Sequence, residues 1–416
     1  MSMAEPSQGR RQAAFIFVFL TVLLDMLALG VVIPVLPKLV LHFVNGDDTQ
    51  AAEVYGLFST VWALMQFLFS PLQGALSDRF GRRPVILASN FGLCFDYVLM
   101  ALAPSLWWLF VGRMLSGITA ASISTANAYI ADVTPPEKRA GAFGMMGVAF
   151  SVGFILGPAL GGFLASYDPR LPFWASAVLS LMNGLYGLVV LPESLPRERR
   201  GAWRWARANP IGSLALLRSH AELLGLAVTN LLSAFAHAAL PTVMVLYMTY
   251  RYGWDERMIG LTMAIIGFST LVMQGMVVRP FVARFGERAA LYTGYALGAA
   301  GFATIGLAPN GYWLWAGIAL LSSWALSSAA VMSLMTRRVA SNEQGHLQGA
   351  NASLMGIASM LGPGIFTISY ATAINPKYGY DLPGVPFLIG ALFLLAALFA
   401  GWRVLRKEPS VAQAGV

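Results

Sequence analysis

Charged residues are scarce in this sequence. They make up 11% of its 416 residues, whereas 57% are hydrophobic. A soluble globular chain carries about 25% charged residues, so this chain has too few to cover a surface that faces water. The composition therefore excludes an ordinary soluble protein and indicates one that lies in a lipid bilayer.

Cysteine and histidine are also scarce. The single cysteine, Cys94, cannot form an intrachain disulfide, and it shows with the four histidines no spacing typical of metal ligands. The sequence has no nucleophile–base cluster, no long extra-membrane domain and no GxxxxGK[ST] loop for ATP. We therefore expect no metal, no cofactor, no enzymatic activity and no ATP-driven pumping.

The sequence does contain apolar runs of the length that a spanning helix needs, about 20 residues. Six runs in the first half cover residues 13–37, 54–76, 84–103, 105–131, 141–166 and 171–192. Six runs in the second half cover residues 220–248, 257–279, 288–308, 311–335, 345–373 and 384–406. They predict an all-α integral membrane protein with 12 transmembrane helices in two pseudo-symmetric six-helix halves. The predicted halves are 1–192 and 220–416, joined by a polar, arginine-rich cytoplasmic linker at 193–219.

A charged turn is repeated once in each half. The stretch from Gly74 to Pro84 reads GALSDRFGRRP, and Arg284 to Arg288 reads RFGER. Each turn lies between the second and third apolar runs of its half. A repeat at matching places indicates an internally duplicated membrane protein.

Basic residues are unevenly divided between the two sides of the predicted bundle. With the N-terminus inside, most of the 27 Lys and Arg fall in the two terminal segments, the linker and the loops on that side. Cytoplasmic loops carry the excess of Lys and Arg, so both termini and the linker are expected in the cytoplasm. This placement also explains the net charge of +8 without a nucleic-acid partner.

Three charged residues interrupt the apolar runs: Asp25, Asp96 and Arg113. A charge at the centre of a spanning helix costs about 2.5–3.5 kcal/mol on insertion scales. The helical rise places Asp25 and Asp96 about 17 and 18 Å from the inner face, and Arg113 about 12 Å from the outer face, of a core about 30 Å thick. All three fall at one level, which predicts a shared polar cavity.

These deep charges have two interpretations. Burial favours the protonated form of a carboxyl group, and a nearby guanidinium favours the ionised form, so a site balanced between them can exchange a proton. Asp25 and Asp96 are then candidate proton carriers, and Arg113 holds one of them ionised. The alternative is a fixed structural ion pair between Asp96 and Arg113.

Asp132 ends the fourth run, near the turn that holds Asp78, Arg79, Arg82 and Arg83. There it can pair with one of the three arginines. We expect a gating latch that holds the halves closed on the cytoplasmic side and breaks on opening. A fixed ion pair at a helix end is the alternative.

The fifth run carries glycines at a helical spacing. Gly153, Gly157 and Gly161 share one face, and a face of small residues lets another helix approach closely. Pro158 removes a backbone hydrogen bond and bends the helix. With Gly162 these residues predict a tight contact between moving bundles; a static packing face is the alternative.

Neutral polar side chains at membrane depth are candidates for substrate contact, although each could equally form an interhelical hydrogen bond. The candidates are Gln66, Asn127, His237, Gln274 and Asn351.

Several of these stretches resemble the major facilitator superfamily. Residues 74–83 are similar to its cytoplasmic signature after helix 2, residues 113–117 to its helix 4 signature, and residues 153–162 to the helix 5 signature associated with antiporters. Within the superfamily the sequence is most similar to the tetracycline/proton antiporters. That likeness is carried by DMLALGVVIPVLP (25–37), DRFGRRPV (78–85), GRMLSGITA (112–120), Gly253-Trp254 and residues 348–366.

The resemblance implies a major facilitator fold and a proton-coupled efflux antiporter of amphipathic drugs, which would confer antibiotic resistance by alternating access. It implies coupling and substrate-binding roles for Asp25, Asp96 and Arg113 and a gating role for Asp78, and it matches Gln274 to a helix 8 glutamine. Two positions differ: Gly298 replaces a helix 9 acid and Thr270 a helix 8 histidine. The second half then contributes no deep acid, and coupling rests on the first half.

The expected partners are a small amphipathic substrate, protons and the lipid bilayer. We expect a multi-pass monomer in a bacterial-type cytoplasmic (inner) membrane, driven by the proton gradient. Two alternatives remain open at this point: an exporter of an endogenous metabolite or lipid-like compound, and a non-transporting membrane receptor with the same fold.

Overall fold

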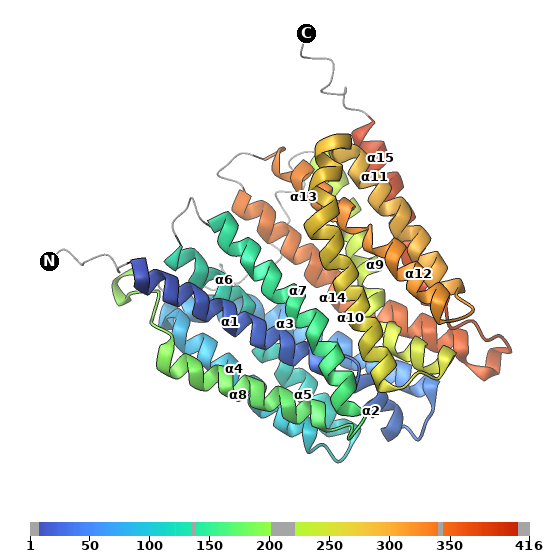
Figure 1. Ribbon diagram of the computed structural model, residues 1–416, viewed down its shortest axis with the longest axis horizontal. Coiled ribbons are helices and arrows are strands. Elements are labelled where there is room, and N and C mark those ends of the chain that lie inside the picture. Colours follow the sequence, from blue (N-terminus) through green and yellow to red (C-terminus); the bar gives the residue numbers. More distant parts are fainter. Residues whose placement is uncertain (1–7, 121, 135–138, 201–220, 340–343, 407–416) are drawn as a thin grey trace, which may run out of the picture. The chain divides into compact units, whose positions relative to one another are not determined.

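The computed structural model describes residues 8–120, 122–134, 139–200, 221–339 and 344–406. Every regular element within these ranges is a helix (Figure 1). The predicted all-α fold is therefore confirmed. The greater part of the predicted linker, residues 201–219, lies outside the described residues.

The described residues of the first half form eight α-helices, each within a predicted apolar run or at its edge. They are α1 (Gln8–Val32), α2 (Leu36–Phe43), α3 (Asp48–Phe80), α4 (Arg82–Ala101), α5 (Leu106–Thr119), α6 (Ser122–Val133), α7 (Arg139–Ala165) and α8 (Leu171–Val190). The first run divides into α1 and α2 at Pro34, which has no N–H to continue the ladder of helical hydrogen bonds.

In the second half, the part of the chain that the structure describes forms seven α-helices and one π-helical segment. They are α9 (Ala221–Tyr252), α10 (Glu256–Val272), the π-helical η5 (Met273–Val277), α11 (Val278–Leu307), α12 (Gly311–Ser322), α13 (Ala325–Thr336), α14 (Gln344–Ile374) and α15 (Val385–Leu405). Inside α11 the backbone leaves helical geometry at Gly286, where φ is 80°. The repeated turn therefore lies within a stretch that is otherwise helical.

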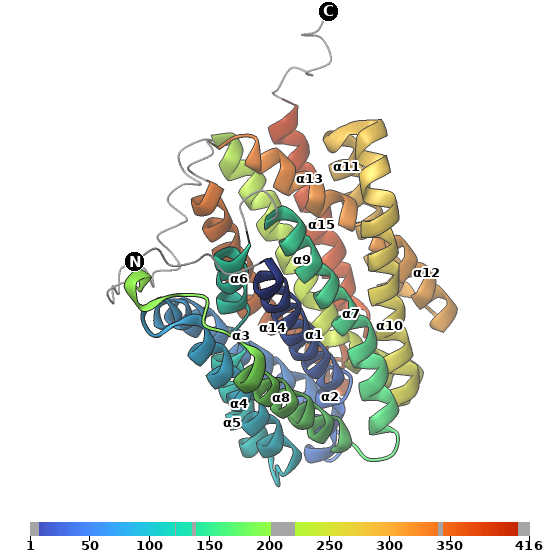
Figure 2. The same ribbon diagram turned by 60° about the vertical axis from the view of Figure 1, so that its left-hand side comes forward.

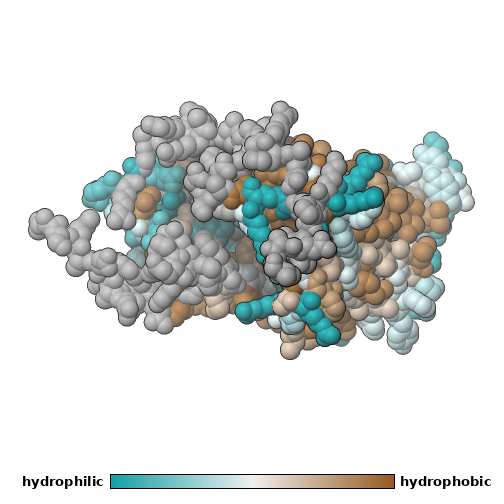
Figure 3. Space-filling model, turned by 90° about the horizontal axis from the view of Figure 1, so that it is seen from above, coloured by the Kyte–Doolittle hydropathy of each residue, from teal (hydrophilic) through white to brown (hydrophobic). Residues whose placement is uncertain are grey.

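Ten helical stretches in the described residues are long and apolar enough to cross a membrane. This number is lower than twelve for two reasons. Residues 256–307 form one continuous stretch, although they contain two predicted runs. The predicted run at 105–131 is divided into two short helices, α5 and α6. The predicted number of twelve spans stays a prediction. Large apolar side chains such as Trp107, Val189 and Tyr312 are exposed, as lipid-facing residues would be, and Figure 3 shows hydrophobic residues at the surface.

The chain packs into two compact units. The first comprises the described parts of residues 1–45, 61–209 and 255–267, and the second those of 46–60, 210–254 and 268–416. In the first unit α1 packs against α7 and α8, and α4 packs against α5 and α8 (Figure 2). In the second, α9 packs against α14 and α15, and α11 packs against α12, α13 and α15. The predicted boundaries at 192 and 220 stay a prediction.

The start of α3, within residues 46–60, belongs to the second unit, whereas the rest of α3 belongs to the first. The start of α10, within residues 255–267, belongs to the first unit, whereas the rest of α10 belongs to the second. The first turns of α10 pack on α7, where a Cβ on Gly267 would lie 2.6 Å from Ile155. The first turns of α3 pack on α9, where the Tyr55 hydroxyl donates to the Pro241 carbonyl oxygen at 3.2 Å. The periodicity of the sequence did not predict that α3 and α10 would be divided between the two units.

Candidate functional site

Asp25 lies on α1 and is buried, with 7% of its surface exposed. The side-chain amide of Asn183 on α8 donates a hydrogen bond of 2.9 Å to a carboxyl oxygen of Asp25. The same amide donates to the Thr21 carbonyl oxygen at 3.1 Å, which fixes its orientation. Sequence reasoning found Asp25 but assigned Asn183 no partner.

Asp96 lies on α4 and is fully buried. It interacts electrostatically with Arg113 and has Ser116 as a second polar neighbour, both on α5. Within the described part of the chain, neither carboxyl oxygen of Asp96 has a partner that meets hydrogen-bond geometry. The guanidinium of Arg113 lies over the ring of Trp62, 5.2 Å from its centroid, a cation–π contact that helps to hold a charge away from water.

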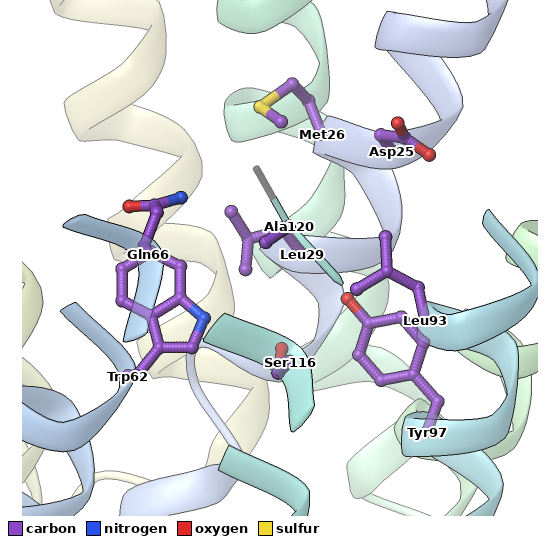
Figure 4. Close-up of a pocket in the computed structure, with 9 residues that line it drawn as sticks. All are labelled: Asp25, Met26, Leu29, Trp62, Gln66, Leu93, Tyr97, Ser116 and Ala120. Atoms are coloured by element: carbon purple, nitrogen blue, oxygen red, sulfur yellow. The ribbon is translucent and has the colours of Figure 1, made fainter. Parts of the chain in front are cut away.

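A small pocket opens beside Asp25. Figure 4 shows Trp62 and Gln66 on one side and Leu93 and Tyr97 on the other. Its lining is Asp25, Met26, Leu29, Trp62, Gln66, Leu93, Tyr97, Ser116 and Ala120. Tyr97 interacts electrostatically with Asp25, Asp96 and Arg113, so the three deep charges lie within electrostatic range of one side chain. The first unit thus brings together the residues that were predicted to share a level.

Arg82 is the centre of the charged turn. Its guanidinium pairs with Asp78 at 2.6 Å and with Asp132 at 3.2 Å, and it donates to the Ser77 hydroxyl at 2.6 Å. Arg82 is buried to 9% exposure, so it has little water to replace these partners. Of the three arginines predicted to meet Asp132, Arg82 is the one that pairs with it. The gating role of these groups stays a prediction.

The other residues of the turn hold its shape. The Arg79 guanidinium lies 5.3 Å from the centroid of the Phe80 ring, and Arg83 donates to the Leu188 carbonyl oxygen at 2.7 Å. Glu193, which follows α8, accepts the Arg82 backbone N–H at 2.8 Å. Glu193 was missed at the sequence level because it stands at the start of a polar linker and has no motif around it.

Two features of this turn require a glycine at position 81. Its φ of 108° lies in a region that other residues rarely adopt, and a Cβ there would collide with the Glu193 carboxylate. The corresponding glycine of the repeated turn, Gly286, also has a positive φ, of 80°. The two turns thus share a glycine in the left-handed region at the same place in the repeat.

The second copy also has an ion pair, with the charges exchanged. Glu287 follows Gly286 as Arg82 follows Gly81, and its carboxylate pairs with Arg337 at 2.8 Å. In both copies the partners are 50 residues apart. The first unit thus has the base on the turn and the acid on the helix end, and the second unit has the reverse.

The predicted glycine face of α7 packs on α1. A Cβ on Gly157 would lie 2.7 Å from the Cα of Gly30, and one on Gly161 would overlap the carbonyl of Val31. Gly153 faces Met26 in the same way, and Gly162 faces the first turn of α10. Pro158 lies inside α7 without ending it. The close contact is present between α7 and α1, which belong to the same unit, and the predicted contact between moving bundles stays a prediction.

The candidate substrate-binding residues lie in both units. In the first, Gln66 lines the pocket and Asn127 is exposed on α6. In the second, Asn351 accepts a hydrogen bond of 3.3 Å from Asn230, and Gln274 is exposed in the π-helical segment η5. π-Helical turns inside α-helices occur frequently at functional sites.

His237 completes this set and belongs to an aromatic cluster of the second unit. Its ring lies 5.8 Å from that of Trp324, whose indole N–H donates to the Ser233 hydroxyl at 3.0 Å. Trp324 also packs at Gly298, where a Cβ would lie 3.2 Å from the Trp324 Cβ and 2.9 Å from Leu394. An acidic side chain at position 298 would therefore not fit beside Trp324 without rearrangement.

No group of three or more His, Cys, Asp or Glu side chains suited to a metal ion occurs among the residues that the structure describes. The described site offers buried carboxyl groups, amides, hydroxyls and aromatic rings.

The chain is similar to known proteins over most of its length. The family model of the Major Facilitator Superfamily matches residues 18–363, and again residues 226–415. The class C tetracycline resistance protein of Escherichia coli is 37% identical, covering 92% of this chain and 95% of its own. The class G tetracycline resistance protein of Vibrio anguillarum is 35% identical, and the match covers 93% of this chain and 96% of that protein. The crystal structure of the human organic anion transporter MFSD10 is 25% identical with a TM-score of 0.70, covering 95% of this chain and all of that one.

Proposed function

The chain belongs to the Major Facilitator Superfamily, and from this premise we propose that it exports amphipathic small molecules in exchange for protons. The tetracycline resistance proteins among its relatives support a drug as cargo. The observation that carries the proposal is Asp25, a buried carboxyl group that is bound by Asn183 and lines a pocket with Tyr97.

The cost of burying Asp25 argues for function. An acid in a spanning helix costs about 2.5–3.5 kcal/mol on insertion scales, and a protein without transport gains nothing from this expense. Asn183 offers an N–H to the ionised carboxylate, and the pocket beside Asp25 gives the carboxyl group a route to exchange its proton. Asp25 can therefore take up a proton when its pocket is open to one side of the membrane and release it to the other.

Asp96 and Arg113 complete the coupling site in this proposal. Arg113 stabilises one negative charge in the first unit through electrostatic interaction with Asp96. When Asp25 is protonated, the charge of the site changes by one, and a change of charge alters the relative stability of the inward-open and outward-open states. Substrate and proton would then occupy the site alternately, as an antiporter requires.

The charged turns would act as gates. Arg82 with Asp78 and Asp132 stabilises the inner end of the first unit, and Glu287 with Arg337 does so in the second. We place both termini in the cytoplasm and the protein, as a monomer, in a bacterial inner membrane. The proton gradient supplies the energy, and no cofactor takes part.

The aromatic cluster of the second unit supports a cargo with a flat apolar face. Trp324 and His237 offer ring surfaces, and Gly298 offers no charge. Among the described residues, the buried acids that a cationic group on the cargo could meet are Asp25 and Asp96 of the first unit. These features favour amphipathic compounds in general over a cargo that needs an acid at position 298.

The test is a transport panel with the full chain in proteoliposomes and a pH dye inside. A pH gradient is imposed, and tetracycline and other amphipathic compounds are added one at a time. We expect at least one compound to accumulate against its gradient while protons move in the opposite direction. Transport without proton movement, or no transport by any compound, would contradict the proposal.

A further inference from the structure

Trp62 on α3 has a hydrogen-bond donor that the mechanism above does not use. Its indole nitrogen is buried, and in the described part of the chain this nitrogen has no hydrogen-bond partner. An indole N–H can donate but cannot accept, so only an acceptor such as an oxygen atom can satisfy it. A buried donor without a partner costs free energy, and a ligand that brings an acceptor to Trp62 removes this cost.

This N–H belongs to the lining of the pocket beside Asp25. In Figure 4 the indole nitrogen of Trp62 and the hydroxyl group of Tyr97 point inward from opposite sides of the lining. Ser116 is 1% exposed and also lines the pocket, and its hydroxyl has no partner in hydrogen-bond geometry among the described residues. The pocket therefore places two unsatisfied donors beside the carboxyl group of Asp25.

The pocket is small. It has room for a group about as large as one water molecule. A single oxygen atom fits in this space, whereas a ring system does not. Much of the remaining lining is apolar and consists of Met26, Leu29, Leu93 and Ala120. The pocket therefore suits an oxygen atom that projects from a larger apolar skeleton.

Two contacts fix the position of the Trp62 side chain. The backbones of α5 and α3 come close at Trp62, where a Cβ on Gly117 would lie 2.5 Å from the Trp62 carbonyl oxygen. The guanidinium of Arg113 lies over the indole ring, 5.2 Å from its centroid. The ring is thus held in place before any ligand arrives, and a donor that is already ordered loses little conformational freedom on binding.

We propose that Trp62 is a specificity-determining residue, whose indole N–H donates a hydrogen bond to an oxygen atom of the cargo. The favoured cargo is an amphipathic compound with an acceptor oxygen, as in a ketone, amide or ester. A compound of the same shape without this oxygen leaves the N–H unsatisfied and binds more weakly. Binding of the oxygen stands on the geometry of the pocket, and export of the bound compound rests on the proposed function.

The first test compares two probes that differ in one group. Benzoylbenzyl-trimethylammonium has a ketone, and benzylbenzyl-trimethylammonium has a methylene group in its place. Their dissociation constants are measured by titration calorimetry with the full chain in nanodiscs, and the signal from empty nanodiscs is subtracted. We expect the ketone to bind about fivefold more tightly, or better. Equal affinity for the two probes, or no binding of the ketone, would overturn the proposal.

The second test removes the N–H and keeps an aromatic ring facing Arg113, by Trp62→Phe. Trp107→Phe is the matched control, because it makes the same change at a position on α5 that is 71% exposed. We expect Trp62→Phe to lose the preference for the ketone and to bind the methylene compound within about twofold of the wild type. The control should keep the preference. A preference for the ketone that survives in Trp62→Phe would overturn the proposal.

An experimental structure of the full chain with the ketone bound decides the proposal if Trp62→Phe does not fold. We expect the ketone oxygen within hydrogen-bond distance, about 2.7–3.2 Å, of the Trp62 indole nitrogen. A ketone oxygen bound elsewhere would overturn the proposal. None of these measurements requires proton movement. If the transport panel shows no exchange of cargo for protons, the proposed function fails, and binding of the two probes still decides whether Trp62 recognises the oxygen.

Discussion

Asn183 and Asp25 are joined by a hydrogen bond of 2.9 Å between two helices that lie far apart in the sequence. Both residues are buried, so water cannot replace the amide if it is removed. The bond places a donor beside the carboxyl group that we assign to coupling. Asp25 also lines the pocket of the first unit.

Replacing Asn183 by Leu is expected to reduce gradient-driven transport about tenfold or more. A hydrogen bond to a charged group contributes about 1.5–3 kcal/mol, and about 1.4 kcal/mol corresponds to a factor of ten. Ser176→Ala is the matched control, because it removes another α8-to-α1 hydrogen bond without contacting Asp25. Equal losses in the two variants would show that helix packing alone is responsible.

The two ion pairs of the repeated turns are expected to differ in strength. In the first pair both side chains are largely buried, with Arg82 10% and Asp132 25% exposed. In the second pair Glu287 is 12% exposed but its partner Arg337 is 72% exposed, so Arg337 can turn to water when Glu287 is removed. Exposed pairs contribute about 0.2–1 kcal/mol, whereas removing one partner of a buried pair costs more. Asp132→Ala should therefore lower the melting temperature more than Glu287→Ala, as measured by thermal unfolding in detergent.

A charge exchange tests whether the second pair matters for transport. Glu287→Arg should slow transport, and adding Arg337→Glu should restore most of it, because the pair is re-formed with its charges reversed. If the double variant is as slow as the single one, the ion pair between these groups is not what supports turnover.

Three glycine-to-alanine variants separate backbone strain from crowding in the charged turns. Gly81→Ala meets both an unfavourable φ and the Glu193 carboxylate, Gly286→Ala meets only the unfavourable φ, and Gly74→Ala meets neither. Strain of this kind costs about 1–3 kcal/mol. We expect the yield of folded protein and its melting temperature to fall most for Gly81, less for Gly286 and not at all for Gly74. Any other order would contradict the described turn.

The close contact of α7 with α1 can be tested in the same way. Gly157→Ala places a methyl group against the backbone of Gly30, whereas Gly147→Ala, on the same helix, has no described atom within 4 Å. Overpacking of this kind typically costs about 1–3 kcal/mol. The first variant should lose stability and transport together, and the second should behave as the wild type. Equal behaviour of the two would show that the helices are not in close contact.

The sequence predicted those features that depend on composition and local spacing. Apolar runs predicted the helices because a bilayer demands continuous apolar length, and Pro34 and Gly286 mark places where single residues interrupt them. Depth along each helix placed Asp25, Asp96 and Arg113 at one level, and Tyr97 does interact with all three.

Partners between helices could not be predicted, because depth does not specify which face meets which neighbour. Asn183 was one of several polar residues at membrane depth, and only packing of α8 on α1 assigns it to Asp25. Glu193 and the exchanged pair of Glu287 with Arg337 also depend on tertiary contact. The packing of Trp324 on Gly298 depends on tertiary contact as well, because the sequence shows only that position 298 has no acidic side chain.

The central claim is that Asp25 carries the coupling proton, and Asp25→Asn tests it most directly. The amide keeps the size of the side chain but cannot be ionised. In proteoliposomes with a cargo that the wild type accumulates, we predict that the variant loses accumulation driven by a pH gradient and retains exchange of labelled for unlabelled cargo. Undiminished gradient-driven accumulation by Asp25→Asn would contradict the account.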